Sequence, residues 1–112
     1  MKLKQVVEEL DLKVLTGEKL LNREIKGGYT SDLLSWVMSH AKEGSLWVTV
    51  QSHQNIVAIA SLLDLAGIIV AEGVNVEPKT REKSEQEKVC ILTTDKNSFE
   101  ISGLLYKLGI GS

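Results

Sequence analysis

A short polar segment holds the residues best suited to binding a charged ligand. Ser52, His53 and Asn55 stand between the apolar run Leu46–Val50 and a second apolar run, Ile56–Leu65. If the first run is a strand and the second a helix, the free N–H groups at the helix start form a seat for an anion. His53 could donate a further hydrogen bond to it. The same residues would also serve simply as helix caps.

The sequence around this segment supplies no recognisable catalytic or metal-binding set. The two histidines, His40 and His53, lack the spacing of a zinc motif, and the single cysteine, Cys90, lies in an apolar run where free cysteine usually packs as a small hydrophobic residue. Neither a nucleophile elbow nor a P-loop occurs. We therefore predict no catalytic residue, no metal and no cofactor. An enzyme using His53 as a general base near Glu72 remains a third hypothesis.

The spacing of apolar residues predicts the elements that must position the polar segment. Helical stripes alternate with short β-rich runs. Strands are expected at 13–16, 24–29, 46–50, 68–71 and 89–93. The expected helices are a helix over 3–10, a helix over 33–41, a helix over 56–65, a solvated helix over 77–88 and a last helix marked by Phe99, Leu104, Leu105 and Leu108 and ending at Gly109. The residues Thr30–Asp32 offer N-cap chemistry for the helix over 33–41, and Pro78 stands where the first residue of the solvated helix would be. The apolar stripe of the helix over 33–41 is Leu33, Leu34, Val37, Met38 and Ala41. Strand, helix and strand in succession form βαβ units with parallel strands. The fold class is therefore α/β, a three-layer α/β/α domain with a mostly parallel sheet built from successive βαβ units.

Ligands of open α/β sheets bind beyond the carboxyl ends of the strands. That rule selects three segments here, at 51–55, 72–75 and 93–98. In the second, Gly73 would allow the backbone to approach a ligand closely, although it could equally be only a turn residue. The predicted ligand-binding residues share this edge of the sheet: Thr49, Gln51, Ser52, His53, Asn55, Glu72 and Gly73.

Length and composition restrict the class of protein. The chain has 112 residues, which corresponds to one domain over 1–112, with 43% hydrophobic residues, 25% charged residues and a net charge of −2. Nucleic-acid and anionic-membrane binders usually carry a basic surplus, so neither partner is expected. The amino-terminal segment is amphipathic rather than a signal sequence, and no apolar run approaches the length of a membrane span. We expect a cytoplasmic protein.

Three stretches of the chain resemble the DRTGG domain family. These are the runs Asp32–Met38, Gly44–His53 and Asn55–Ala60, and the resemblance extends over nearly the whole chain, with the strand, turn, helix and second strand in the family's order. Its likeness is greatest to small stand-alone members that are often encoded near iron hydrogenases and sensor kinases. The family's D-R pair falls on Ser52 and His53, and its T-G-G falls on Ala71, Glu72 and Gly73, so only the last glycine is kept.

The resemblance implies a non-catalytic regulatory or dimerisation module, with a fold similar to the amino-terminal domain of HPr kinase/phosphorylase. The first hypothesis is a homodimeric module that senses a nucleotide or phosphorylated metabolite at the strand ends. The alternative is a docking or dimerisation module for a hydrogenase or sensor-kinase protein partner, with no small ligand. Trp36 lies off the predicted apolar stripe of its helix and could anchor such a partner.

Overall fold

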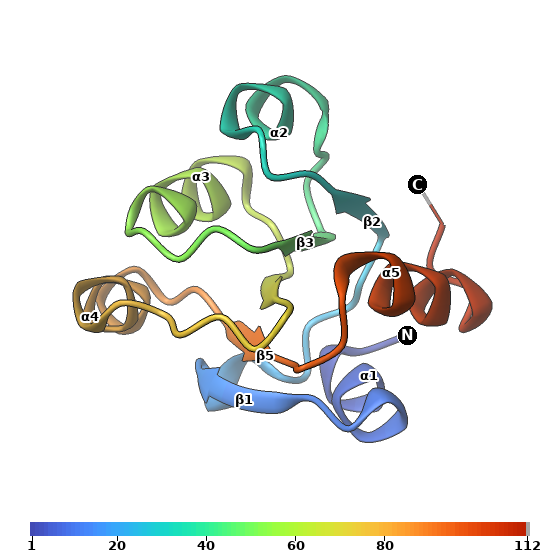
Figure 1. The fold of residues 1–112 in the computed structure, drawn as a ribbon. Coiled ribbons are helices and arrows are strands. Elements are labelled where there is room, and N and C mark those ends of the chain that lie inside the picture. The colour runs from blue at the N-terminus through green and yellow to red at the C-terminus, as the bar shows by residue number, and fades with distance from the viewer. Residues whose placement is uncertain (112) are drawn as a thin grey trace.

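A five-stranded sheet runs through the middle of the molecule, with helices on both faces (Figure 1). The computed structural model describes residues 1–111. The elements in chain order are α1 (Leu3–Leu10), β1 (Lys13–Thr16), the short 3₁₀ helix η1 (Glu18–Leu20), β2 (Gly27–Thr30), α2 (Leu34–His40), β3 (Ser45–Thr49), α3 (Asn55–Leu63), β4 (Gly67–Val70), α4 (Pro78–Glu87), β5 (Ile91–Thr93) and α5 (Ser98–Lys107).

The strand order is β1-β5-β4-β3-β2, and the four strands from β2 to β5 are parallel neighbours in chain order. The first strand, β1, is antiparallel to β5, with Lys13 opposite Thr93. The sheet is therefore mostly parallel, which confirms the predicted fold class.

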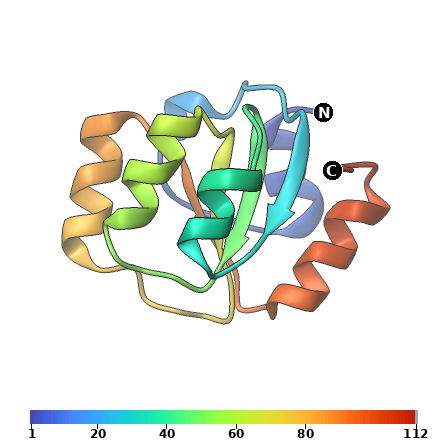
Figure 2. The same cartoon turned by 90° about the horizontal axis from the view of Figure 1, so that it is seen from above.

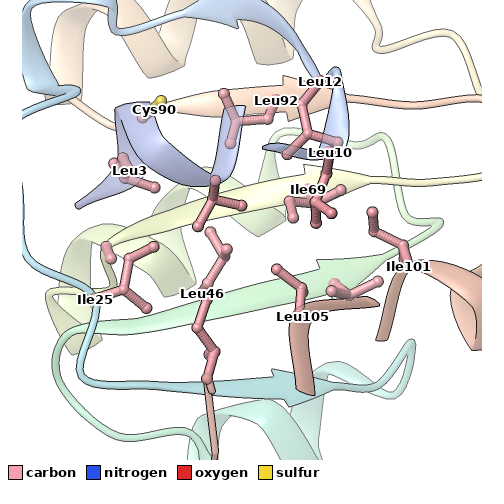
Figure 3. Packing of buried hydrophobic residues seen from close by; sticks show 14 of the residues in the cluster. Leu3, Leu10, Leu12, Ile25, Leu46, Ile69, Cys90, Leu92, Ile101 and Leu105 are labelled. Carbon is pink, nitrogen blue, oxygen red and sulfur yellow. The ribbon is translucent and has the colours of Figure 1, made fainter. Parts of the chain in front are cut away.

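The helices form two layers around this sheet. Successive parallel strands joined by right-handed crossovers place every connecting helix on one face, so α2, α3 and α4 cover one side while α1 and α5 cover the other (Figures 1 and 2). Each interface has its own apolar cluster. Trp47 and Ile56 belong to the cluster under α2 and α3, whereas Leu3, Leu46 and Ile101 belong to the cluster under α1 and α5 (Figure 3).

The third strand is the centre of the packing. All five of its residues are buried, because one face lies under α3 and the other under α5. A strand covered on both faces is mostly apolar, and this explains the run Leu46–Val48 at the centre of β3, between the buried polar residues Ser45 and Thr49. Cys90 is also buried, just before β5, and packs in the cluster under α1 and α5.

Four of the five strands differ from their predicted bounds: β3 and β4 each begin and end one residue earlier, and β2 and β5 differ more. The second strand covers Gly27–Thr30 rather than 24–29, since Glu24 pairs with Lys2 in an isolated bridge and both glycines lie within the strand. The last strand, β5, is limited to Ile91–Thr93 instead of 89–93. At β2 and β5, buried apolar residues such as Ile25 and Val89 lie outside the part of the chain that is hydrogen-bonded in the sheet.

The second helix differs from prediction in its cap and in its buried face. Asp32 does not cap α2, because its carboxylate bonds to the end of β3. Of the expected apolar stripe, Val37 alone is fully buried, while Leu33 and Met38 are exposed. The cause is the position of α2 at the β2 end of the sheet, where it overhangs the edge (Figure 1).

The last helix has a different inner face from the one expected. Phe99 was predicted on the apolar stripe, but it is 90% exposed, and Ile101 and Leu105 are buried instead. The helical period of about 3.6 residues places Phe99 on the side of α5 opposite Ile101 and Leu105, so it cannot share their buried face. The helix begins after Asn97, whose side chain accepts a hydrogen bond from the N–H of Glu100. Within residues 1–111, no helix is long and apolar enough to cross a membrane.

Candidate functional site

Four loops meet where the parallel strands end. The carboxyl ends of β2, β3, β4 and β5 lie at one edge of the sheet, and β1 begins at that same edge because it is antiparallel. The residues predicted to bind a ligand all follow or end β3 and β4. The structure places them at this edge but divides them among three local environments.

The first environment is a clamp around Asp32. The hydroxyl of Thr49 donates to Oδ1 of Asp32 over 2.9 Å, and the N–H of Val50 donates to the same oxygen over 2.8 Å. The side-chain amide of Gln51 donates to the carbonyl of Asp32 over 3.0 Å. Thr49 is fully buried. These bonds tie the end of β2 to the end of β3, so Thr49 and Gln51 are engaged in positioning the loops.

The second environment is the turn that leads into α3. Nδ1 of His53 accepts a hydrogen bond of 3.2 Å from the N–H of Asn55, which is the first residue of the helix. Both side chains are exposed. The carbonyl of Ser52 accepts a bond of 2.7 Å from the hydroxyl of the buried Thr80 on α4. The turn is therefore fixed to the neighbouring helix, with His53 and Asn55 on its outer side.

The third environment is the pair of loops after β4 and β5. Glu72 donates its N–H to the carbonyl of Lys96, and Gly73 donates its N–H to the carbonyl of Thr94. Both donors adopt left-handed backbone conformations, with φ of 65° at Glu72 and 67° at Gly73. A Cβ at residue 73 would lie 3.0 Å from Oδ1 of Asp95. The backbone turn and the close neighbour together favour glycine at this position.

A cavity of about 600 Å³ opens beside these loops. It lies at the β5 side of the edge, where the antiparallel β1 begins, and it is bounded by the loop after β4 and by α4. Of the seven predicted residues, only Gly73 lines it. The lining residues are Asp11, Lys13, Leu15, Gly73, Val74, Asn75, Val76, Arg81, Thr93, Thr94, Asp95 and Lys96.

Three cations give the cavity its chemical character. Lys13 comes from β1, Arg81 from α4 and Lys96 from the loop after β5. Across residues 1–111, none of the three forms an ion pair with a carboxylate. Asp11 and Asp95 add two negative charges, so the formal charge of the lining is 3 − 2 = +1. Cations that converge on one cavity without partners are suited to an anionic ligand.

Sequence reasoning missed these cations for identifiable reasons. Lys13 is the first residue of β1. It lies at the carboxyl ends of the parallel strands because β1 is antiparallel to β5, and no local sequence signal predicts that pairing. Arg81 lies in the charge-rich stretch 77–88, which was interpreted as a solvated helix face. Lys96 falls within the predicted segment 93–98 but was not selected, because one lysine in a polar loop is unremarkable.

The topology also explains why the cavity is not at the end of β3. A crevice opens at a strand end where neighbouring connections leave toward opposite faces of the sheet. Here α3 and α4 leave toward the same face and contact each other, which closes the space between the ends of β3 and β4. The connections diverge after β4 and β5, because α4 and α5 cover opposite faces of the sheet, and the cavity lies beside the loops that follow these two strands, next to the antiparallel β1. No group of three or more His, Cys, Asp or Glu residues in the described part of the chain is arranged to hold a metal ion.

Comparisons with known proteins agree with this architecture. A solved structure of the CBS and DRTGG domains of the regulatory region of Clostridium perfringens pyrophosphatase, in complex with its activator diadenosine tetraphosphate, superposes with a TM-score of 0.73 at 16% sequence identity. The match covers 93% of this chain and 45% of that chain, so this protein spans about half the length of its structural neighbour. A search of curated protein sequences found no match. The family model described as DRTGG domain matches residues 5–108. The chain therefore belongs to the DRTGG domain family.

Proposed function

We propose that this chain is a cytoplasmic, non-catalytic regulatory module, a single domain over residues 1–112 that acts as a homodimer and binds a nucleotide or phosphorylated metabolite at the carboxyl ends of its strands. The observation that carries the proposal is the convergence of Lys13, Arg81 and Lys96 on one cavity. These side chains come from three separate elements, and only the folded chain brings them together.

The cavity matches the parts of a nucleotide. Its volume of about 600 Å³ is within the range of roughly 300–1,000 Å³ typical of small-molecule sites. The three cations suit phosphate oxygens, the carboxylates of Asp11 and Asp95 are acceptors suited to ribose hydroxyls, and apolar side chains such as Val74 can cover a base. A bare inorganic anion would use the cations alone. The mixed lining therefore favours a nucleotide over inorganic phosphate.

The site includes part of the predicted residue set in defined roles. Gly73 brings its backbone to the cavity wall, and Glu72 holds the loop after β4 against α5 by accepting a bond of 3.4 Å from the N–H of Ser98. Thr49 and Gln51 fix the loops through Asp32. We propose that Ser52, His53 and Asn55 extend the ligand-binding edge toward β3, where they would contact the end of a long ligand such as a dinucleotide.

Binding fits these residues better than catalysis. A general base needs a partner or substrate proton within hydrogen-bond reach, and the bond that His53 makes is accepted from the backbone of its own turn. None of the hydrogen bonds within residues 1–111 joins His53 to Glu72. The structural neighbour is a regulatory region that binds a nucleotide activator, and this supports the regulatory assignment.

A thermal-shift screen tests the proposal. The purified chain would be heated separately with ATP, ADP, diadenosine tetraphosphate and inorganic phosphate. Each ligand would be present at about 100 times an assumed micromolar Kd. A specific ligand at that excess stabilises the folded state by about 2.7 kcal/mol, which raises Tm by several degrees. We expect a nucleotide to do so and inorganic phosphate to have a smaller effect. The absence of a shift with every nucleotide would contradict the proposal.

A second candidate function, docking onto a protein of a hydrogenase or sensor-kinase system, rests on the outer face of α2. Trp36 is 53% exposed, and its ring stacks on His40 with centroids 4.4 Å apart. His40 in turn stacks on Tyr29. A held, half-exposed tryptophan is a typical anchor of a protein interface. In this case Trp36→Ala would weaken binding of the purified partner protein at least tenfold, whereas unchanged binding would exclude the anchor.

A further inference from the structure

The outer face of α5 carries the two most exposed large hydrophobic side chains of the described chain. Phe99 is 90% exposed and Tyr106 is 75% exposed. They are seven residues apart, or two helical turns, so they lie on the same stripe. The stripe points away from the sheet, because Ile101 and Leu105 occupy the opposite, buried face. In both views α5 lies at the outside of the molecule with no other element beyond it (Figures 1 and 2).

A glycine lies between the two aromatic residues. Gly103 is on the same stripe, one turn from each, and a Cβ at this position would have no neighbour within 4 Å. The fold itself therefore does not require glycine here, and in a helix interior glycine is less favourable than alanine. A small residue at the centre of an exposed apolar stripe lets a second helix approach closely.

The charges beside the stripe are self-complementary. Glu100 is in the first turn of α5 and Lys107 in its last, and they are also seven residues apart, on the same side of the stripe. If a second α5 packs antiparallel about a two-fold axis near Gly103, each Glu100 faces the Lys107 of the other copy. Each Phe99 then faces the other Tyr106. The same rotation satisfies both pairs, as an isologous interface requires.

We propose that the outer face of α5 is the interface between two copies of this chain, formed by an antiparallel α5–α5 pair with Gly103 at its centre. This inference rests on the homodimer included in the proposed function, and it names the surface that forms it. The occupant is a second copy because the apolar pair and the charge pair both match their own two-fold images. An unrelated partner would not need that symmetry.

Sedimentation equilibrium of the full chain with charge variants tests the interface. Glu100→Lys and Lys107→Glu each place like charges opposite one another at two points in the dimer, so we expect each variant to weaken dimerisation at least tenfold. The double variant E100K/K107E exchanges the two charges and should restore the dissociation constant to within a few-fold. Circular dichroism would verify that α5 remains helical in each variant.

Apolar variants give an independent readout of the same surface. Phe99→Ser should make the chain monomeric at concentrations where the native chain is a dimer. Leu62→Ser is the matched control, because Leu62 is 69% exposed on α3, on the far side of the sheet, and it should leave the dimer unchanged.

Each outcome of these experiments has a defined consequence. A native chain that is monomeric at all concentrations overturns both the dimer and the interface. If the native chain is a dimer and Phe99→Ser, or both single charge variants, dimerise equally well, the α5 interface is wrong and the dimer forms through another surface. Nucleotide binding is measured separately by the thermal shift, so neither result is confused with failure of the ligand site.

Discussion

The hydroxyl of Thr49 donates a hydrogen bond of 2.9 Å to the carboxylate of Asp32, which is 17 residues earlier in the chain. Thr49 is fully buried, and Oδ1 of Asp32 also accepts from the N–H of Val50. This pair joins the ends of two neighbouring parallel strands at the edge where the ligand is proposed to bind. This hydrogen bond holds the two strand ends in place. Its loss should therefore lower the free energy of unfolding even when no ligand is present.

Removing the hydroxyl of Thr49 tests that role. Thr49→Val keeps the shape of the side chain but removes the donor to Asp32 and the acceptor for the N–H of Gln51. Buried hydrogen bonds of this kind are worth about 1–3 kcal/mol when one partner is lost, so urea denaturation should show a loss in that range. Ser52→Ala is the control. Within residues 1–111 the hydroxyl of Ser52 forms no hydrogen bond, so this variant should unfold with nearly the same free energy as the native chain. Equal stability of the native chain and Thr49→Val would contradict the clamp.

Gly17 should be the glycine least tolerant of substitution. It has φ of 78°, and a Cβ there would lie 2.7 Å from the Cα of Cys90, a backbone atom that cannot move aside. Gly17→Ala therefore combines backbone strain with overpacking and should cost roughly 2–4 kcal/mol.

Gly109 provides the matched comparison. Its φ is 97°, but a Cβ there would have nothing within 4 Å, so Gly109→Ala carries the strain alone, about 1–2 kcal/mol. Urea denaturation of both variants measures the difference between them. If the two substitutions cost the same, the close approach to Cys90 contributes nothing and the explanation is wrong.

The thiol of Cys90 should make the fold less stable at high pH. Burial, with a smaller contribution from the Glu85 carboxylate, raises the pKa of Cys90 to about 12. In the unfolded chain the thiol ionises near pH ~8.5. Between these two values the unfolded state has released the proton and the native state retains it, so the free energy of unfolding falls as pH rises, by about 1.4 kcal/mol per pH unit at most.

Comparison with Cys90→Ala isolates this effect from other titrating groups. Urea denaturation of both proteins between about pH 7.5 and about pH 10.5 should show the native chain losing stability faster than the variant above the thiol's unfolded pKa. Below that pKa the two curves should run parallel. Curves that stay parallel over the whole range would mean that the thiol ionises in the folded protein as readily as in the unfolded one.

Local sequence patterns were sufficient for most of the fold. The run around Trp47 is largely apolar because β3 is covered on both faces, and Pro78 is the first residue of α4 as expected. Tertiary contacts outweighed local preference at Asp32, which has the side chain of a helix cap but bonds to the end of β3 instead. For Phe99 the predicted stripe itself was wrong, because at about 3.6 residues per turn this side chain lies opposite the buried Ile101 and Leu105.

The edge of the sheet at which the cavity opens was predictable in part. The rule that ligands bind at strand carboxyl ends selected the correct edge for the cavity, and Gly73 lies in its wall. The position along that edge was not predictable, since it depends on the antiparallel pairing of Lys13 with Thr93 and on α4 turning Arg81 toward the sheet edge. Both are properties of the assembled sheet. A single sequence contains no local signal for either of them.

The turn at the end of β3 can be separated from the cavity by mutation. His53→Ala combined with Asn55→Ala removes two exposed side chains and one hydrogen bond, from the backbone N–H of Asn55 to Nδ1 of His53, so Tm should change by no more than a few degrees. If the ligand reaches this turn, the double variant should weaken binding of diadenosine tetraphosphate by several-fold and leave binding of ADP unchanged. Equal effects on both nucleotides would remove the turn from the extended site.

If Lys13, Arg81 and Lys96 bind the phosphates of a nucleotide, as we propose, isothermal titration calorimetry with matched charge variants should show the loss of one of these cations as weaker binding. Each charge-assisted hydrogen bond lost costs about 1.5–3 kcal/mol, so Arg81→Gln should weaken binding of the best nucleotide from the thermal screen by roughly 10- to 100-fold. Lys79→Gln removes a positive charge from the same helix, α4, but outside this cavity. This variant should bind the nucleotide as tightly as the native chain does. If the native chain, Arg81→Gln and Lys79→Gln all bind the nucleotide with equal affinity, the nucleotide phosphates do not bind at Arg81 and the proposed site is wrong.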